Sequence, residues 1–97
     1  MQLEEIRPED FEPLLGSYLE LRAGALTLAT EVLALKRLPS HRLRAHPPFA
    51  LVLRGGREPT LGQGMVVLAH PTLGALEFFA VPLGQDTQGM RYEITFN

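Results

Sequence analysis

The three histidines of this chain, His41, His46 and His70, are its only imidazoles and its first candidates for chemistry. Imidazole nitrogens are common zinc ligands, and the three could meet at one metal ion if the loop at 39–48 folded over the turn at Pro71. However, prolines stiffen that loop, and it holds no carboxylate to complete or orient a metal site. We therefore expect solvated loop histidines, with no metal and no cofactor.

Nucleophilic catalysis has few candidates, because the chain has no cysteine and only two serines, Ser17 and Ser40. Ser40 adjoins His41, but neighbours in an extended loop point apart, and no G-x-S-x-G elbow surrounds the serine. The glycine-containing segments 55–57 and 62–64 resemble phosphate-binding loops. Neither opens a helix, and the first lacks the following Lys-Ser/Thr. We interpret these glycines as turn residues.

Two carboxylates, Glu77 and Glu93, are the candidates for an acid–base pair. Both lie in predicted strands whose apolar neighbours face inward, which places the carboxylates on the wet face, where they can pair with Arg91 across the sheet. The residues thus predict no enzyme. The alternative is a small-molecule- or metal-binding β-barrel, or a minor hydrolase, that uses the loop histidines.

Charge is distributed unevenly along the chain. Residues 36–57 hold six basic residues and no acid, whereas residues 1–20 hold six acids and one arginine. Nucleic-acid-binding domains are usually basic overall or place aromatic rings among their cations, while this chain has a pI near 5.9. We do not expect nucleic-acid binding. The basic stretch is either a solvated face or a surface that steers docking to another subunit or partner.

The loop at 38–48 is the predicted partner-facing surface. Three of its residues are prolines, and it carries two arginines without a local acid. Loops held by a rigid scaffold are where binding residues commonly lie. We predict that a protein partner or a second copy of the chain contacts this loop through His41, Arg42, Arg44 and His46.

Length and composition describe one small domain, residues 1–97. Apolar residues make up 45% of the chain and charged residues 21%, with a formal net charge of −2, as in ordinary soluble globular proteins. No apolar run approaches the ~18 residues of a membrane-spanning helix, and the acidic start lacks the basic region of a signal peptide. We expect a soluble, cytoplasmic protein without membrane contact. Eight arginines against one lysine hint at a thermophile.

The last third of the chain has the pattern of a three-strand antiparallel meander. Apolar segments at 64–70 and 75–83 flank a turn at 71–74, and a loop at 84–89 leads to a final strand at 90–97. Polar and apolar residues alternate along that strand with the period of two that gives a strand one apolar face. The residues expected to face the core are Tyr92, Ile94 and Phe96.

The first half predicts a short helical turn and three strands. Residues 7–16 carry a proline and two acids near their start and end in glycine, as a short helical turn does. Residues 17–22 alternate like a strand. Residues 26–38 also fit a helical stripe, but we favour a long strand with a bulge near residues 29–30, because strands flank it. Residues 49–53 are apolar on both faces, which marks a covered central strand.

These elements predict an all-β fold: a small antiparallel barrel or compact sandwich of about six strands, with one short N-terminal helical turn. The pattern of strands alone leaves the barrel and the sandwich open.

Several segments, taken together, resemble a family of small bacterial proteins known as a domain of unknown function. The sequence Phe-Ala-Leu-Val-Leu-Arg-Gly at 49–55, the long segment from His70 to Gly84 and the C-terminal strand carry the likeness, which covers most of the chain. Members are often encoded beside proteins that resemble phage tail collar components. The resemblance implies an accessory or assembly role and supplies no catalytic residue. We accordingly expect a non-enzymatic protein-binding or assembly accessory domain associated with a phage-tail-like structure.

Overall fold

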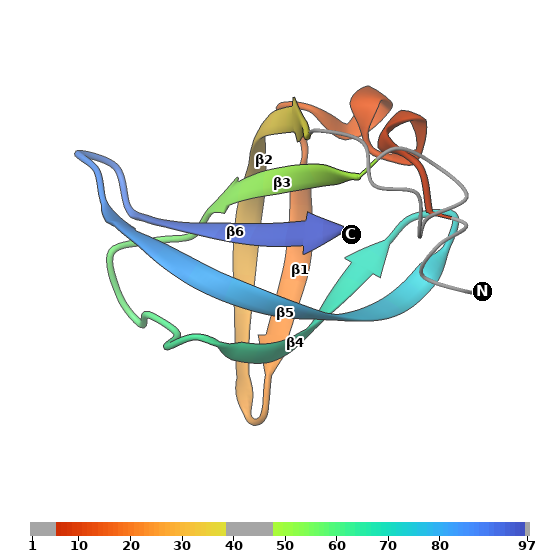
Figure 1. Ribbon diagram of the computed structural model, residues 1–97. Helices are drawn as coiled ribbons and strands as arrows, with labels where there is room; N and C mark the ends of the chain where they lie inside the picture. Colours follow the sequence, from red (N-terminus) through yellow and green to blue (C-terminus); the bar gives the residue numbers. More distant parts are fainter. Residues whose placement is uncertain (1–5, 39–47, 97) are drawn as a thin grey trace.

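In the computed structural model, which describes residues 6–38 and 48–96, the chain forms a closed barrel of six antiparallel strands (Figure 1). The predicted all-β class with a short N-terminal helical piece is confirmed, and closure of the sheet decides for the barrel over the sandwich. The elements are η2 (Pro8–Asp10), η3 (Glu12–Leu14), β1 (Tyr18–Ala23), β2 (Leu26–Arg37), β3 (Phe49–Arg54), β4 (Gly64–His70), β5 (Gly74–Gln85) and β6 (Met90–Phe96).

The barrel consists of two three-strand meanders, β1-β2-β3 and β4-β5-β6. The strands follow one another around the barrel in the order β1-β2-β3-β6-β5-β4, so the meanders meet at two seams, β3–β6 and β1–β4. The middle strands, β2 and β5, have 12 residues each. Each bends across the barrel and pairs with one neighbour along its first part and with the other along its second part.

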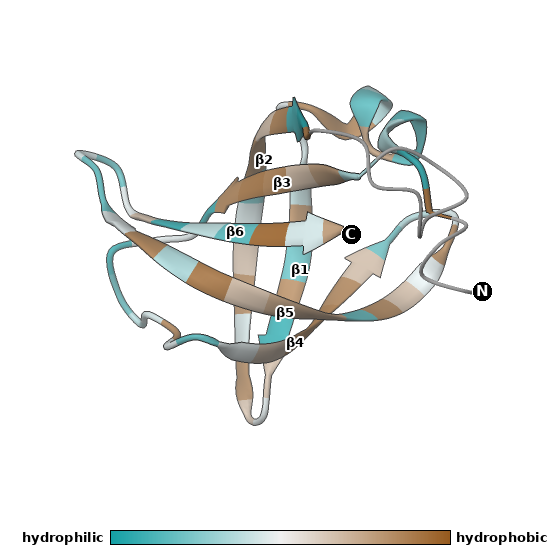
Figure 2. Ribbon diagram, viewed as in Figure 1, coloured by the Kyte–Doolittle hydropathy of each residue, from teal (hydrophilic) through white to brown (hydrophobic). Residues whose placement is uncertain are grey.

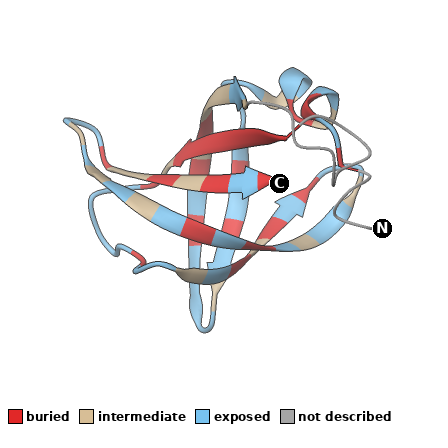
Figure 3. Ribbon diagram, viewed as in Figure 1, coloured by how far each residue is buried: buried red, intermediate tan, exposed pale blue. Residues whose placement is uncertain are grey.

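Alternation along the strands places one face of each strand inside the barrel (Figure 3). In β6 the three residues predicted to face the core are buried, while Thr95 between them is exposed. Full burial of a large apolar side chain contributes roughly 1.5–3 kcal/mol, so the apolar positions decide which face turns inward. Other buried residues of this alternating pattern are Leu19 and Leu21 in β1 and Val66 and Leu68 in β4.

β3 is buried on both faces, as its continuous apolar run predicts. Its inward residues are Phe49, Leu51 and Leu53. The outward residues Ala50 and Val52 are also buried. Lys36 of β2 lies opposite Ala50, Glu93 of β6 lies opposite Val52, and the two charged groups meet at 3.8 Å. The ion pair therefore spans β3 and covers its small outer side chains.

The ambiguous segment 26–38 forms a strand, β2, as favoured over a helix. The predicted bulge near residues 29–30 is wrong in position, because the register shift falls between Val32 and Ala34. It lies just after the point where β2 leaves β1 and continues along β3. An extra residue bends a strand locally, so the bulge helps β2 to turn from its pairing with β1 to its pairing with β3.

The turn between β4 and β5 forms as predicted, with Gly74 at φ 83°, a left-handed conformation that glycine adopts without strain. β5 then extends to Gln85, beyond the predicted loop start at residue 84, because Gln85 still pairs with Met90 of β6. The connection between β5 and β6 is correspondingly shorter than expected.

Aromatic rings fill the end of the barrel next to the 3-10 helices. Phe11, which lies between η2 and η3, is fully buried, with its ring centroid 5.5 Å from that of Phe96 and 6.1 Å from that of Phe49. Phe78 of β5 meets Phe96 edge-on at 4.5 Å. The N-terminal helical piece therefore closes this end of the barrel through Phe11.

Candidate functional site

The residues predicted to bind a partner lie outside the described part of the chain: His41, Arg42, Arg44 and His46. Their role stays a prediction. On either side of that loop, the N–H of Leu38 donates to the carbonyl of Pro48 at 3.0 Å. The pairing of β2 with β3 therefore continues up to the start of the loop.

His70 fixes the N-terminal helical piece to the β4–β5 turn. Its Nε2 lies 2.7 Å from the carbonyl oxygen of Asp10, and its Nδ1 accepts the N–H groups of Thr72 and Leu73, each at 3.1 Å. Because Nδ1 accepts two backbone donors it carries no proton, so Nε2–H donates to the carbonyl. The ring is buried against Phe11 at 5.0 Å. The expectation of a solvated histidine is wrong for His70, and its engaged nitrogens do not support metal ligation.

The described part of the basic stretch is largely paired with acids. The Nζ of Lys36 lies 3.8 Å from the carboxylate of Glu93, and the guanidinium of Arg37 lies 3.6 Å from that of Glu12. The predicted pairing of Glu93 with Arg91 is wrong, because Lys36 reaches Glu93 across the small outer side chains of β3. These partly exposed pairs contribute about 0–1 kcal/mol each.

Arg54 connects β3 to β2 and to the β5–β6 loop. Its Nη1 lies 3.0 Å from Oδ2 of Asp86 and its Nη2 lies 3.2 Å from Oε1 of Glu31. The Asp86 carboxylate also accepts the N–H groups of Gln88 at 2.8 Å and Gly89 at 2.9 Å. The Gln88 N–H, together with the Arg54 guanidinium, lowers the pKa of Asp86 below its usual value. This arginine therefore serves the scaffold.

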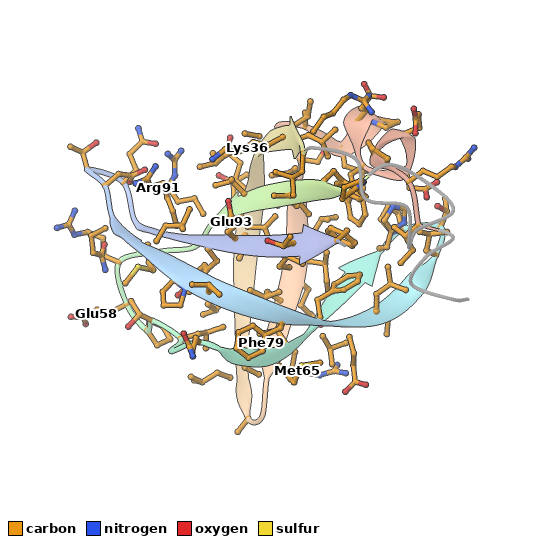
Figure 4. The ribbon with its side chains drawn as sticks, in the orientation of Figure 1. Lys36, Glu58, Met65, Phe79, Arg91 and Glu93 are labelled. Atoms are coloured by element: carbon orange, nitrogen blue, oxygen red, sulfur yellow. The ribbon has the colours of Figure 1, made fainter. Side chains whose placement is uncertain are left out.

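Four large apolar side chains are exposed on the outside of β4 and β5, and we name them the apolar stripe: Met65 (59% exposed), Phe79 (50%), Leu83 (41%) and Val81 (37%). Met65 and Phe79 are opposite residues of the β4–β5 ladder. Figure 4 shows them together, apart from the labelled charged residues of β2 and β6. Figure 2 shows the many hydrophobic positions of β5. The stripe is the described feature most typical of a binding surface.

Opposite charges lie at the two ends of the apolar stripe. Glu77 is exposed two residues before Phe79, on the same face of β5. Arg91 of β6 lies opposite Gly84 at the other end, which is about 23 Å further along β5 at ~3.3 Å per residue. Among the described residues neither charge has an ion-pair partner, and the Nε of Arg91 is buried without a hydrogen bond.

Our sequence-based prediction did not include the apolar stripe, although the sequence carries a signal for it. A strand with one buried face alternates apolar and polar residues, yet Phe78, Phe79, Ala80 and Val81 are apolar at successive positions. Because Phe78 and Ala80 are buried, Phe79 and Val81 face solvent. An unbroken apolar run in a strand of a small barrel therefore indicates either a covered outer face or a binding surface.

Ser17 and the candidate metal ligands of the described residues are placed as follows. Within residues 6–38 and 48–96, no group of three or more histidine, aspartate or glutamate side chains is placed to hold a metal ion. Ser17 lies exposed before β1, with its backbone bonded to Leu14 and Val32. Over the same two ranges, no helix has the length and apolar character needed to cross a membrane.

The fold and its surface define a class: a small antiparallel barrel of six strands, with internal polar links at His70 and Arg54 and an apolar stripe on its outside. The model of the family described as "Domain of unknown function (DUF6916)" matches residues 6–96. The protein belongs to this family, which confirms the resemblance to a domain of unknown function. No curated protein matches the chain, and no solved structure matches it.

Proposed function

We propose that this protein is a non-enzymatic protein-binding domain that serves assembly, and that two copies pair through the apolar stripe. The observation that carries the proposal is the exposure of Met65, Phe79, Val81 and Leu83 next to one another on the outside of the barrel. The setting we propose, from the resemblance stated above, is a soluble, cytoplasmic bacterial protein that accompanies a phage-tail-like structure.

Exposed apolar surface of this kind favours association. The stripe presents an apolar area on the order of 300 Å², which is comparable with the largest contiguous apolar patch of a typical monomeric protein, and such patches are often binding sites. Removing apolar surface from water contributes roughly 25 cal/mol per Å². A partner that covers the stripe therefore gains free energy without a change in the barrel itself.

The charges at the ends of the stripe favour a second copy as the partner. In a twofold pairing whose axis is perpendicular to the strands, the two stripes run antiparallel, so that Glu77 of one copy lies beside Arg91 of the other at both ends. Each charge lacks an ion-pair partner among the described residues of its own copy. Complementary charges at both ends also fix the register of the two strands.

The area predicts a weak, reversible dimer. Two stripes bury about 600 Å² together, which is below the ~1,200 Å² of a stable interface, so we expect a dissociation constant on the order of 100 μM. Weak contacts of this kind suit an assembly, because copies held near one another on a larger structure bind with a raised effective concentration.

Sedimentation equilibrium from about 10 μM to about 1 mM tests the pairing. The wild type should show a concentration-dependent dimer. Phe79→Ser removes the aromatic ring of the stripe and should weaken the dimer at least about tenfold. Ala69→Ser, at an exposed position of β4 outside the stripe, is the matched control and should change nothing.

Exchanging the charges tests whether Glu77 of one copy lies beside Arg91 of the other. Glu77→Arg and Arg91→Glu each place like charges opposite one another at both ends, so each variant alone should associate more weakly than the wild type at low salt. An equimolar mixture of the two regains opposite charges at both contacts and should associate again. The differences should shrink at high salt, which screens exposed charges.

The pairing of copies is contradicted if the wild type stays monomeric at about 1 mM. It is also contradicted if the equimolar mixture of the two charge variants associates no more tightly than each variant alone. In that case a different purified protein whose binding is lost with Phe79→Ser would replace the second copy as partner and keep the stripe as a binding surface. A Phe79→Ser variant that alters neither kind of binding contradicts the proposed function.

A further inference from the structure

β2 continues past the end of β3 and leaves one of its edges without a neighbouring strand. It pairs with β1 over residues 26–31 and with β3 over residues 31–37. The pairing of β2 with β3 begins at Glu31, which lies opposite Arg54. The residues of β2 before Glu31 belong to the part of the β1–β2 hairpin that extends away from β3 (Figure 1). In the described part of the chain, residues 26–30 therefore have a paired strand on one side only.

The phase of the hydrogen bonds shows which backbone groups face this free edge. The N–H of Val32 donates to the carbonyl of Ser17 at 2.9 Å, and the carbonyl of Val32 accepts the N–H of Gly16 at 2.8 Å. In an antiparallel ladder every second residue bonds to the same side, so the even-numbered residues before Val32 bond towards β1. Thr27 and Ala29 therefore turn their N–H and C=O groups towards the free edge.

A hollow adjoins the free edge where β3 ends. Beyond β3, the N–H of Gly55 donates to the carbonyl of Met90 at 2.9 Å, and the carbonyl of Gly56 accepts the N–H of Met90 at 3.3 Å. These bonds continue the alignment with β6 past the end of β3, whereas the pairing with β2 ends at Arg54. The hollow has a volume of about 290 Å³, and its lining includes Tyr18, Ala29, Gly55, Gly56 and Gln88.

Tyr18 and Ala29 give the hollow its character. Tyr18 is 66% exposed and lines both this hollow and an adjoining one of about 210 Å³ that includes Thr27. The small side chain of Ala29 leaves open the space between the tyrosine and the two glycines. Glu31 and Arg54, paired at 3.2 Å, also line the hollow. The hollow is therefore a recess with polar groups at its rim. Its volume is at the small end of the range for ligand pockets and suits one side chain.

We infer that this edge and its hollow bind an extended peptide segment of a protein partner. The segment adds to β2 as an antiparallel strand in line with β3, and its backbone bonds to the N–H and C=O groups of Thr27 and Ala29. The side chain opposite Ala29 is aromatic and enters the hollow beside Tyr18. The backbone bonds hold the segment, and the hollow selects the side chain. The site is separate from the apolar stripe, which lies on β4 and β5.

A single strand suits this edge better than a second copy of the barrel. A strand bound here has β2 on one side and the segment of Gly55 and Gly56 on the other. Every strand of a second barrel brings a neighbouring strand with it. An isolated extended segment brings no such neighbour.

Amide hydrogen exchange measured by NMR tests the site. The probe is a capped peptide of about seven residues in which threonine and valine alternate around a central tyrosine. At about 1 mM peptide, the exchange of the Thr27 and Ala29 amides should slow at least about tenfold. The same peptide with an N-methyl group on its central tyrosine lacks the N–H that bonds to Ala29, and it should cause no slowing.

Matched variants test whether peptide binding depends on the hollow or on another part of the surface. Ala29→Phe fills the hollow, keeps every backbone group and should abolish protection of the Thr27 amide by the peptide. Ala69→Phe, the same substitution at an exposed position of β4, should bind the peptide like the wild type. Tyr18→Ala should weaken binding at least about tenfold. Phe79→Ser should leave peptide binding unchanged, which distinguishes this site from the stripe.

Three results would each overturn the inference: unprotected Thr27 and Ala29 amides at about 1 mM peptide, equal protection by the N-methylated peptide, or equal loss in Ala29→Phe and Ala69→Phe. If Ala29→Phe does not fold, Tyr18→Ala and the N-methylated peptide decide the question, because Tyr18 is exposed and its removal leaves the core intact.

Discussion

Phe49 and Phe96 face each other across the β3–β6 seam and stack almost parallel, with ring centroids 4.2 Å apart and an interplanar angle of 5°. Phe11 packs against both rings, and Phe78 packs against Phe96. One cluster therefore joins the two meanders and the N-terminal helical piece.

Removing the Phe96 ring should destabilise the whole domain. The ring is buried and contacts three other aromatic residues, so Phe96→Ala should cost ~3–5 kcal/mol, whereas Phe96→Leu fills much of the space and should cost less. Urea unfolding followed by circular dichroism measures both. Equal free energies of unfolding for the alanine variant and the wild type would place the ring outside the core.

A side chain at residue 89 should not be tolerated. A Cβ built on Gly89 overlaps the carbonyl oxygen of Gly55, a backbone atom of the segment that follows β3 and is hydrogen-bonded to Met90. Gly89→Ala should therefore destabilise by at least about 2 kcal/mol. Gly62→Ala is the control, because a Cβ there meets nothing within 4 Å, and its melting temperature should match the wild type. Similar melting temperatures for both variants would contradict the close approach.

The hydroxyl of Tyr92 holds the segment before β4 to the core. The N–H of Leu61 donates to this buried oxygen at 2.9 Å. Tyr92→Phe keeps the ring but leaves the N–H without its partner, so it should cost about 1–3 kcal/mol. Tyr18→Phe removes an exposed hydroxyl and should be neutral. Thermal unfolding of the pair measures the difference, and an unaffected Tyr92→Phe would mean that water satisfies the amide.

Asp86 should stabilise the fold in a pH-dependent way. The Gln88 N–H and Arg54 lower its pKa in the folded state, so between the folded and unfolded pKa values the unfolded state binds more protons. The ionised Asp86 carboxylate therefore adds its full contribution to the free energy of unfolding above about pH 4, the usual carboxyl pKa. This contribution is lost as the pH falls through the pKa of Asp86 in the folded state.

Asp86→Asn should therefore be less stable than the wild type at neutral pH, and the difference should shrink below about pH 4. Urea unfolding across the pH range measures it, with Glu58→Gln as the control for the loss of one exposed carboxylate. A difference that stays constant into acid would show that the shape of the loop, and not the charge, is what Asp86 supplies.

Much of the fold is predictable from local pattern, since strands such as β1 and β6 bury the residues that a period of two marks and β3 is marked by its continuous apolar run. Closure of the barrel and the partners of single charges are not, because they depend on which strands meet in space. Glu93 pairs with Lys36, for instance, only because β3 lies between them with small outer side chains.

The candidate sites were harder to predict for a related reason. The apolar run that contains Phe79 identifies a strand, but only the barrel shows which of its faces is left uncovered. The free edge at Thr27 and Ala29 exists because β3 is shorter than β2, a relation between two segments that neither sequence contains alone.

The two seams of the barrel differ in length, and this difference predicts the order of folding. β3 and β6 share six residue pairs, whereas β1 and β4 share two, around Leu21 and Leu68. Pairs within a meander join residues near in sequence and form at low entropic cost, while both seams join distant ones. We expect the meanders to form first, the β3–β6 seam to dock them, and the β1–β4 seam to close last. Measured φ-values should then show native structure in the transition state at Leu51 and Ile94, but not yet at Leu21 and Leu68.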